Sequence, residues 1–360
     1  MKKVEPGKIK KTKLFIQVPC LNEENSLPAV IADLPRRIEG VDEIYTLIID
    51  DGSTDRTIDV AEELGVDFIV KNNRNMGLTR AFGKGLEAAL FLGADIIVNT
   101  DGDNQYRGAD IVRLVRPVLD KKADVVVGCR DMEGQRDFSA MKKVLQRLGS
   151  RVVRRLSGTD VPDATSGFRA MTRGAAMRFS FMSNFSYTLE MLIQAGRTGM
   201  KVAWVPIRTN ARTREGRLFK SIPHFIYNQT KTMLSAYIFY RPIHIFGALA
   251  ALFFLLSALL AGRVVYFLTL PDPSMVKFKT GTGITLLFTS IVTVFFLGAG
   301  LLGSVLSGLR FLLVDVRGRL RNRELQHKVC PEGVEIIKAP QFFRWAWKDR
   351  DYRTKVGSLR

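Results

Sequence analysis

The amino-acid sequence predicts an α/β domain with a parallel sheet, followed by a hairpin of two membrane-spanning helices. Short apolar runs rich in β-branched residues alternate with helical patterns through the first part of the chain. Two long uncharged stretches follow them. Basic residues gather on either side of those stretches. Together these three patterns separate a globular domain from a membrane anchor.

The strands are expected where the short apolar runs occur, at residues 14–18, 45–50, 66–70, 95–100 and 124–128. Helical patterns lie between and after them, at residues 26–40, 55–65, 79–93 and 109–122. Continuous apolar strands that alternate with helices are typical of a parallel sheet with helices on both faces.

Polar clusters follow three of these strands: "PCLNEE" the first, "DDGSTD" the second and "DGDNQY" the fourth. In parallel sheets, ligands bind beyond the carboxyl ends of the strands. No GxGxxG follows the first strand and no GxxxxGK[ST] occurs in the chain, which disfavours ordinary dinucleotide and P-loop sites.

The acids of these clusters, Asp50, Asp51, Asp101 and Asp103, are expected to converge at one edge of the sheet. Four carboxylates in one place repel one another unless a cation or hydrogen-bond donors compensate them. Carboxylate oxygens suit Mg²⁺ or Mn²⁺, and Mg²⁺ usually completes its shell with phosphate oxygens and water. The alternative for each acid is helix capping after a strand, which is favoured for Asp55.

The composition restricts the partners and the compartment. The 360 residues include 54 Lys and Arg against 35 Asp and Glu, a net charge of +19. Such a charge suggests nucleic acid, anionic lipid or a phosphorylated substrate as partner. Cys20, Cys129 and Cys330 are far apart and form no CxxC, so neither disulfides nor a zinc site are expected, and a reducing cytoplasm is the simplest compartment.

Two uncharged stretches predict transmembrane helices at about residues 243–268 and 282–309. A helix needs roughly 20 apolar residues to cross a bilayer, and a buried core helix is the alternative. Basic residues flank the outer ends of both spans, whereas the connection between them carries few charges. The positive-inside bias therefore predicts a multi-pass protein of the cytoplasmic membrane, with the α/β domain and both termini in the cytoplasm.

The chain accordingly divides into five segments. They are a basic tail at residues 1–13, an α/β domain at 14–217, a juxtamembrane helix at 218–241, the two transmembrane helices within 242–314, and a basic cytoplasmic tail at 315–360. Within the α/β domain, residues 136–156 combine seven basic residues with apolar residues at helical spacing. This pattern predicts an amphipathic helix on an anionic membrane surface; a basic solvated face over a core helix is the alternative.

Six short motifs occur in a familiar order: "PCLNEE", "IIDDGSTD", "NRNMGLTRA", "NTDGDNQY", "VVGCR" and "DATSGFRAM". In this respect the chain resembles glycosyltransferase family 2, whose GT-A fold holds a metal and a nucleotide diphosphate at a D-x-D motif. With its C-terminal hairpin it is most similar to the polyprenyl-phosphate glycosyltransferases, including dolichyl-phosphate mannose synthases and undecaprenyl-phosphate sugar transferases.

The resemblance implies a set of site residues. Those expected to bind the nucleotide are Pro19, Glu23, Asp50, Asp51, Gly77, Lys84, Asp101 and Arg214, the last in a mobile basic loop, "TREGRLFKS". Asp103, with Asp101, would hold Mg²⁺ or Mn²⁺. Those expected at the acceptor phosphate are Gln105, Arg130, Arg147 and Ser150. Asp163 is the candidate for a basic or orienting carboxylate, so the catalytic set is Asp101, Asp103, Arg130 and Asp163.

The implied reaction is an inverting transfer from a UDP- or GDP-sugar to undecaprenyl or dolichyl phosphate. A lipid phosphate oxygen attacks the anomeric carbon and the nucleoside diphosphate leaves, with the metal and arginines stabilising its charge. The implied partners are the nucleotide sugar, the lipid phosphate, the membrane and a further copy of the chain in a homo-oligomer.

Three other hypotheses compete with a polyprenyl-phosphate glycosyltransferase. A processive polysaccharide synthase shares the motifs, and "QFFRW" at residues 341–345 matches its Q-x-x-R-W, but it follows both spans instead of preceding them. A nucleic-acid-binding membrane protein is disfavoured because the basic residues lie near the spans and not among stacking aromatics. An inactive scaffold relative is disfavoured by the intact pair Asp101 and Asp103 and by Arg130.

Overall fold

The computed structural model describes residues 11–130, 140–181, 187–210, 231, 234–235, 238–269, 276–327 and 334–338. The chain forms two units, one of Met1–Lys220 with Val316–Arg360, the other of Ser221–Asp315. Several sequence predictions lie outside the described residues. They are the first ten residues, Cys330, the loop "TREGRLFKS" with Arg214, most of the juxtamembrane helix, and "QFFRW".

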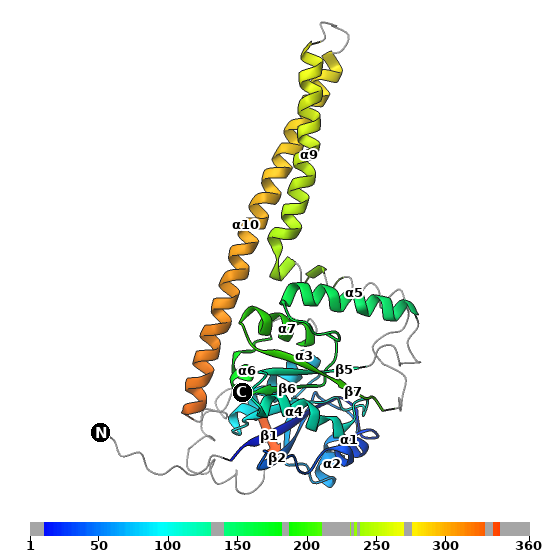
Figure 1. The fold of residues 1–360 in the computed structure, drawn as a ribbon, viewed down its shortest axis with the longest axis vertical. Coiled ribbons are helices and arrows are strands. Elements are labelled where there is room, and N and C mark those ends of the chain that lie inside the picture. Colours follow the sequence, from blue (N-terminus) through cyan, green and yellow to red (C-terminus); the bar gives the residue numbers. More distant parts are fainter. Residues whose placement is uncertain are drawn as a thin grey trace, which may run out of the picture. The chain divides into compact units, whose positions relative to one another are not determined.

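An eight-stranded sheet forms the centre of the first unit, in the order β7-β5-β6-β4-β1-β2-β3-β8 (Figure 1). The strands are β1 (Lys13–Cys20), β2 (Glu43–Asp50), β3 (Phe68–Lys71), β4 (Ile96–Asn99), β5 (Val125–Arg130), β6 (Arg169–Thr172), β7 (Val202–Ile207) and β8 (Glu335–Lys338). The five predicted strands, β1 to β5, run in the same direction, as expected. Two strands that were not predicted, β6 and β8, run antiparallel to their neighbours.

Helices cover both faces of this sheet, so the predicted α/β class is confirmed (Figure 1). They are α1 (Leu27–Asp33), α2 (Thr57–Glu63), α3 (Leu78–Phe91), α4 (Ile111–Leu119), α5 (Ala140–Ser157), α6 (Arg173–Arg178) and α7 (Tyr187–Arg197). Alternate residues along the strands face opposite layers. In β2, Ile49 packs with Phe82 of α3, whereas Ile48 packs with Ala61 of α2.

Helix α1 ends earlier than its apolar pattern suggests. The residue after it, Leu34, is extended, with ψ at 137°. Pro35 follows, and a proline disfavours helical backbone in the residue before it. The chain therefore turns away before residue 40, the predicted end of this helix.

Helix α5 packs closely on α7. Val153 and Leu156 of α5 are buried, and Val153 lies in one apolar cluster with Leu189 and Leu192 of α7. At the end of both helices, a Cβ on Gly196 would lie 1.8 Å from the carbonyl oxygen of Ser157. Only glycine permits this approach.

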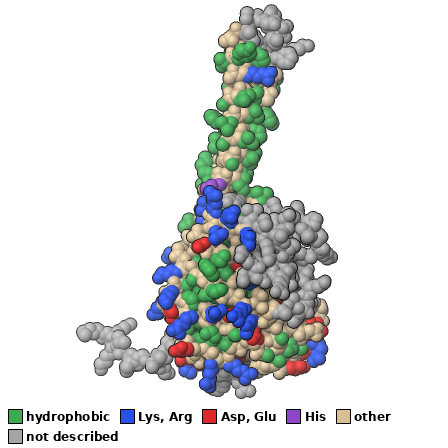
Figure 2. All heavy atoms as spheres, turned by 45° about the vertical axis from the view of Figure 1, so that its right-hand side comes forward, with side chains coloured by type: hydrophobic (Ala, Val, Ile, Leu, Met, Phe, Trp, Pro, Cys, Tyr) green, Lys and Arg blue, Asp and Glu red, His purple; other side chains and the backbone are tan. Residues whose placement is uncertain are grey.

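The second unit contains an apolar helical hairpin. Its helices are α9 (Pro242–Thr269) and α10 (Val276–Gln326), and α10 continues into the first unit. Only 11% and 17% of their most apolar windows are buried, so apolar side chains cover the outside of the hairpin (Figure 2). This exposure argues against core helices, which bury such side chains. Ser257 donates a hydrogen bond of 2.8 Å to Thr289 between the two helices.

The C-terminal segment differs most from the sequence prediction, which treats residues 315–360 as a tail. In the structure α10 extends to Gln326, and β8 then pairs with the edge strand β3. Strand β8 has only four residues, too few for a recognisable strand pattern in the sequence. Its partner β3 lies far away along the chain, so no hairpin pattern indicates the pairing either.

Replacing Gly196 by alanine tests the contact between α5 and α7. We expect Gly196→Ala to lower the free energy of unfolding by about 1–3 kcal/mol, because the added methyl group forces the helices apart. Denaturant unfolding of the detergent-solubilised chain measures this change. Gly174→Ala is the control, since its Cβ meets only an atom at 3.9 Å, and it should be neutral or stabilising by up to about 1 kcal/mol. Equal effects of the two substitutions would contradict the prediction.

Candidate active site

The acids after β2 are compensated by hydrogen-bond donors. Both carboxylate oxygens of Asp50 lie 3.2–3.3 Å from the backbone N–H of Ser53. Asp51 accepts hydrogen bonds from the Asn72 side chain at 2.8 Å and from the backbone N–H groups of Met76 and Gly77 at 3.0 and 2.8 Å. The bonds of Asp51 order the loop 72–77, and both acids have hydrogen-bond donors within the protein.

Gly77 and Lys84, two further residues predicted to bind the nucleotide, lie on α3 or just before it. Gly77 precedes the first residue of α3 with φ at +89°, a conformation that favours glycine. Burial lowers the pKa of Lys84, although the negative charges of Asp51 and Glu87 act in the opposite direction. Asp51, just after β2, is thus one of three acids whose charge acts on Lys84, with Glu87 and Glu335.

The acids after β4 are not compensated in the same way. Among the described residues, none donates a hydrogen bond to the Asp101 carboxylate. Burial and the neighbouring charge of Asp103 raise the pKa of Asp101 to about 7, although Arg130 acts in the opposite direction. Asp103 accepts a hydrogen bond of 3.1 Å from the backbone N–H of Gln105. Within the described part of the chain, the charges of Arg130 and Arg169 act on Asp101 but do not offset its burial, so its pKa stays raised.

This pair fits a divalent cation that shares its ligands with a substrate. No cluster of three metal-binding side chains occurs within the described residues. Mg²⁺ in phosphate-binding sites commonly takes one or two carboxylates and completes its shell with phosphate oxygens and water. Asp101 and Asp103 thus match a cation that binds together with a diphosphate.

The end of β1 lies directly beside this pair. A Cβ on Gly102 would lie 3.1 Å from the carbonyl oxygen of Pro19 and 3.3 Å from Cγ of Glu23. The structure therefore brings Pro19 and Glu23, both predicted at the nucleotide, into contact with the Asp101–Asp103 turn. The glycine permits this close approach.

Asn210 was not predicted, yet it holds the turn that carries Asp103. Its backbone N–H donates to the carbonyl of Gln105 at 2.9 Å, and its side chain donates to the carbonyl of Asn104 at 3.1 Å. Asn104 has φ at +57°, which asparagine tolerates better than most residues. These contacts join residues 105 and 106 positions apart, so no local pattern could have revealed them.

Arg130 and Asp163 form a buried ion pair. Nε of Arg130 lies 2.7 Å from one carboxylate oxygen of Asp163, and its Nη2 lies 3.1 Å from the other. Their side chains are 9% and 1% exposed. Burial would raise the pKa of Asp163, but the charge and hydrogen bonds of Arg130 outweigh it, so the pKa lies below its ordinary value. Asp163 is therefore an ionised partner of Arg130.

A second buried arginine, also not predicted, anchors the loop that contains Asp163. The guanidinium of Arg169 donates to the carbonyl groups of Ser166, Thr188 and Ala164 at 2.7–2.9 Å. Ser150, predicted at the acceptor phosphate, is buried and accepts a hydrogen bond of 3.3 Å from the backbone N–H of Ala164. Arg147 is exposed on α5. In this structure Ser150 contacts the loop that holds Asp163.

Gly167 joins the parts of the site through a layer of buried polar groups. Its N–H donates to Tyr106 at 3.0 Å and its carbonyl accepts from Asn99 at 2.9 Å. A Cβ at this position would lie 3.0 Å from a carboxylate oxygen of Asp101 and 2.7 Å from the Tyr187 hydroxyl. The motif "DATSGFRAM" thus supplies both the loop geometry and the space for Asp101.

Known proteins resemble this chain in sequence and in structure. The family model "Glycosyl transferase family 2" matches residues 15–179. The uncharacterized protein MJ1222 of Methanocaldococcus jannaschii is 31% identical over 210 residues, which are 56% of this chain and 84% of that protein. A UDP-N-acetylglucosamine--dolichyl-phosphate N-acetylglucosaminyltransferase of Methanococcus voltae is 29% identical over 218 residues, 54% of this chain and 85% of that protein.

Among solved structures, glucosyl-3-phosphoglycerate synthase from Mycobacterium tuberculosis, in complex with Mn²⁺, UDP and glucosyl-3-phosphoglycerate, is similar with a TM-score of 0.49. It is 20% identical, and the match covers 63% of this chain and 79% of that one.

Replacing Asp163 by asparagine tests the buried ion pair. We expect Asp163→Asn to cost about 3–5 kcal/mol of stability at pH 7, because it leaves Arg130 buried without its counter-charge. Asp163 has a lowered pKa in the folded state, so its contribution is complete above about pH 4, the ordinary value, and is lost as the pH falls through the folded value. Unfolding curves at several pH values measure both effects.

The surface acid Asp160 provides the control. It pairs with Arg154 and is 90% exposed, so Asp160→Asn should cost less than about 1 kcal/mol. A cost for Asp163→Asn as small as this one would contradict the assignment.

Replacing Asn210 by alanine tests its hold on the turn of Asp103. We expect Asn210→Ala to weaken Mn²⁺ binding by roughly five- to tenfold, the effect of losing about one hydrogen bond of 1–1.5 kcal/mol. The electron paramagnetic resonance signal of free Mn²⁺ measures the affinity without any turnover. Asn322→Ala, at an exposed position of α10, should leave it unchanged. Unaltered Mn²⁺ binding in Asn210→Ala would show that the turn does not depend on this residue.

Proposed function

The chain belongs to glycosyltransferase family 2, and from this premise we propose that it transfers a sugar from a nucleotide-diphospho-sugar to a polyprenyl phosphate. The product is a polyprenyl-phosphate sugar with inverted configuration at the anomeric carbon. The name of the Methanococcus voltae relative, which pairs UDP-N-acetylglucosamine with dolichyl phosphate, supports this choice of substrates.

The observation that carries the proposal is the contrast between two neighbouring charge arrangements. Within the described residues, the Asp101 carboxylate accepts no hydrogen bond and Asp103 accepts one, from the backbone N–H of Gln105, whereas Arg130 is a cation paired with the buried Asp163. The charge of Arg130 acts on Asp101, so the two arrangements share one site. A reaction between two phosphate-containing substrates needs both: a cation to offset the diphosphate on the acidic side, and an arginine for the second phosphate.

Mg²⁺ or Mn²⁺ held by Asp103 with Asp101 would offset the charge that develops on the leaving nucleoside diphosphate. Pro19 and Glu23, which contact the turn of Asp103, would border the nucleoside beside it. Asp50 and Asp51 contribute indirectly, since they order the loop 72–77 that leads into α3.

Arg130 is proposed to orient the acceptor phosphate for attack. Its guanidinium is fixed by Asp163 and by Thr165, whose hydroxyl lies 3.0 Å from Nη2. A phosphate monoester has its second pKa near 6, so the acceptor is largely ionised at pH 7 and needs no strong base. The lowered pKa of Asp163 makes its carboxylate a weak base. Of the two roles considered for Asp163, a basic or an orienting carboxylate, this favours the orienting role.

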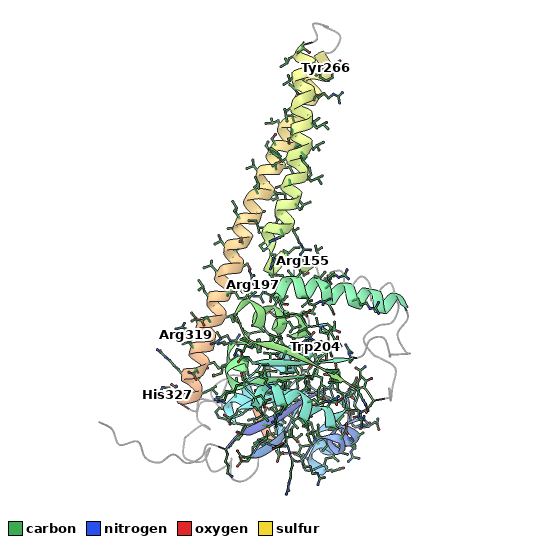
Figure 3. All side chains as sticks on the ribbon, viewed as in Figure 1. Arg155, Arg197, Trp204, Tyr266, Arg319 and His327 are labelled. Carbon is green, nitrogen blue, oxygen red and sulfur yellow. The ribbon has the colours of Figure 1, made fainter. Side chains whose placement is uncertain are left out.

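The apolar hairpin is proposed to anchor the enzyme beside its lipid acceptor. Both helices are long and apolar enough to span a membrane. Helix α5 packs on the core through Val153 and Leu156 and exposes Arg151 and Arg155; Arg155 lies at its C-terminal end (Figure 3). This exposed basic face suits an anionic membrane surface. The positive-inside bias favours a cytoplasmic position for the first unit and both termini. Homo-oligomerisation remains a prediction.

A direct assay tests this function. The purified chain is incubated with UDP- and GDP-sugars, undecaprenyl or dolichyl phosphate and Mn²⁺, and the lipid product is identified by mass spectrometry. We expect a polyprenyl-phosphate monosaccharide, and we expect Asp103→Ala to lower kcat by at least about 100-fold, the range for losing one group that stabilises developing charge.

Asp120→Ala is the matched control, because Asp120 pairs only with surface residues and should leave turnover unchanged. Full turnover in Asp103→Ala would contradict the assignment of the acidic pair. A polysaccharide in place of a glycolipid would favour the processive synthase, and no sugar transfer with any donor would reject the enzyme.

A further inference from the structure

The chain leaves the first unit before the hairpin and returns to it afterwards. The returning part, which we call the return segment, consists of residues 316–327, which include the end of α10, and of residues 334–338, which include β8. Arg319 and His327 mark its helical part in Figure 3. It lies outside residues 15–179, which the family model matches.

Two arginines of the return segment bind α3 and the turn after α6. Nη2 of Arg321 lies 2.8 Å from Oε1 of Glu87, and its Nη1 donates to the carbonyl of Phe179 at 3.1 Å. One helical turn earlier, Arg317 lies 3.5 Å from the same Glu87 oxygen and donates to the Ser180 hydroxyl at 3.1 Å. The side chains of Arg321 and Glu87 are only 11% and 19% exposed, so water screens this pair weakly.

Apolar contacts secure the same segment. Val334 is buried in the cluster that also contains Phe82 and Leu86 of α3, and Leu325 and Ile336 pack against that cluster. The return segment is therefore packed against the core and is not a solvated tail.

Strand β8 contacts β3, the strand that leads into the loop 72–77 beside the predicted donor site. It pairs antiparallel with β3, with Glu335 opposite Lys71 at the carboxyl end of β3. The next residue, Asn72, holds Asp51 through its side chain and donates its N–H to the carbonyl of Asp50 at 2.9 Å. The return segment thus contacts both elements that flank the loop 72–77.

The placement of Glu87 gives the ion pair a functional consequence. Glu87 follows Lys84 by three positions on α3, so the two side chains lie on the same face of the helix. The charge of Glu87 acts on Lys84, as do the charges of Asp51 and of Glu335 in β8. Without Arg321, Glu87 would keep Arg317, which lies 3.5 Å from it, compared with 2.8 Å for Arg321, and is 54% exposed, so this pair is more strongly screened by water. The charge of Glu87 would then act more strongly on Lys84 and draw the lysine away from a bound diphosphate.

We propose that Arg321 and Glu87 are positioning residues for donor binding, in which Arg321 engages Glu87 and so leaves Lys84 to the nucleotide diphosphate. This inference rests on the proposed function, since it assumes a nucleotide beside Lys84. It makes the segment beyond the membrane hairpin a supporting part of the donor site.

Nucleotide binding to the purified full-length chain tests the inference without turnover. Isothermal titration calorimetry with UDP and with GDP, in the presence of Mn²⁺, gives the dissociation constants of the wild type, Arg321→Ala and Arg321→Lys. We expect Arg321→Ala to weaken binding of the preferred nucleotide by roughly tenfold, as for the loss of one charge-assisted contact. Arg321→Lys keeps the positive charge and should weaken it less.

The double variant Arg321→Ala with Glu87→Gln separates positioning from general structural support. If Glu87, without Arg321, captures Lys84, removing the charge of Glu87 should restore binding to within about twofold of the wild type. A merely structural contact predicts a double variant at least as weak as Arg321→Ala. Arg323→Ala, at an exposed position of the same helix, is the control and should bind like the wild type.

The outcomes distinguish failure of this inference from failure of the proposed function. Wild-type binding together with an unchanged affinity in Arg321→Ala, or with no recovery in the double variant, overturns this inference alone. A wild-type chain that binds neither UDP nor GDP overturns the proposed function and this inference with it.

Discussion

Charge balance at the carboxyl edge of the sheet is the constraint on which the rest of the site depends. Parallel strands deliver four aspartates to one edge, and such a cluster is stable only where each carboxylate has a partner. The structure divides them. Asp51 accepts three hydrogen bonds from N–H groups, whereas among the described residues Asp103 accepts one and Asp101 none. Asp51 thus shapes the loop 72–77, and Asp101 with Asp103 is the pair that fits a divalent cation.

The remainder of the site is built from contacts that fix loops, and few of its side chains are free to move. Arg169 gathers three carbonyl groups, Asn210 holds the turn of Asp103, and Gly167 leaves space for Asp101. Arg130 is aligned by two bonds to Asp163. A site that stabilises developing charge benefits from this rigidity, because groups that are already oriented need not reorganise during the reaction.

The apolar hairpin is joined to the first unit at both of its ends along the chain. The chain returns from the hairpin as the last turns of α10 and as β8, which extends the sheet beyond β3. Strand β8 thereby covers the edge of β3 and becomes the last strand of the sheet. Through Arg321 and Glu87, the same segment meets the helix that carries Lys84.

The sequence by itself determined the fold class, the acidic clusters and the two apolar helices, because each depends on a local pattern: strand and helix periodicity, residues at strand ends, and the length of an uncharged run. Only the tertiary structure decided which acids are compensated, that Ser150 is buried against the Asp163 loop, that Asn210 and Arg169 hold loops of the site, and that Arg321 pairs with Glu87. These roles come from contacts between distant positions, 234 residues apart for Arg321 and Glu87, and such pairing has no signature until the chain is folded.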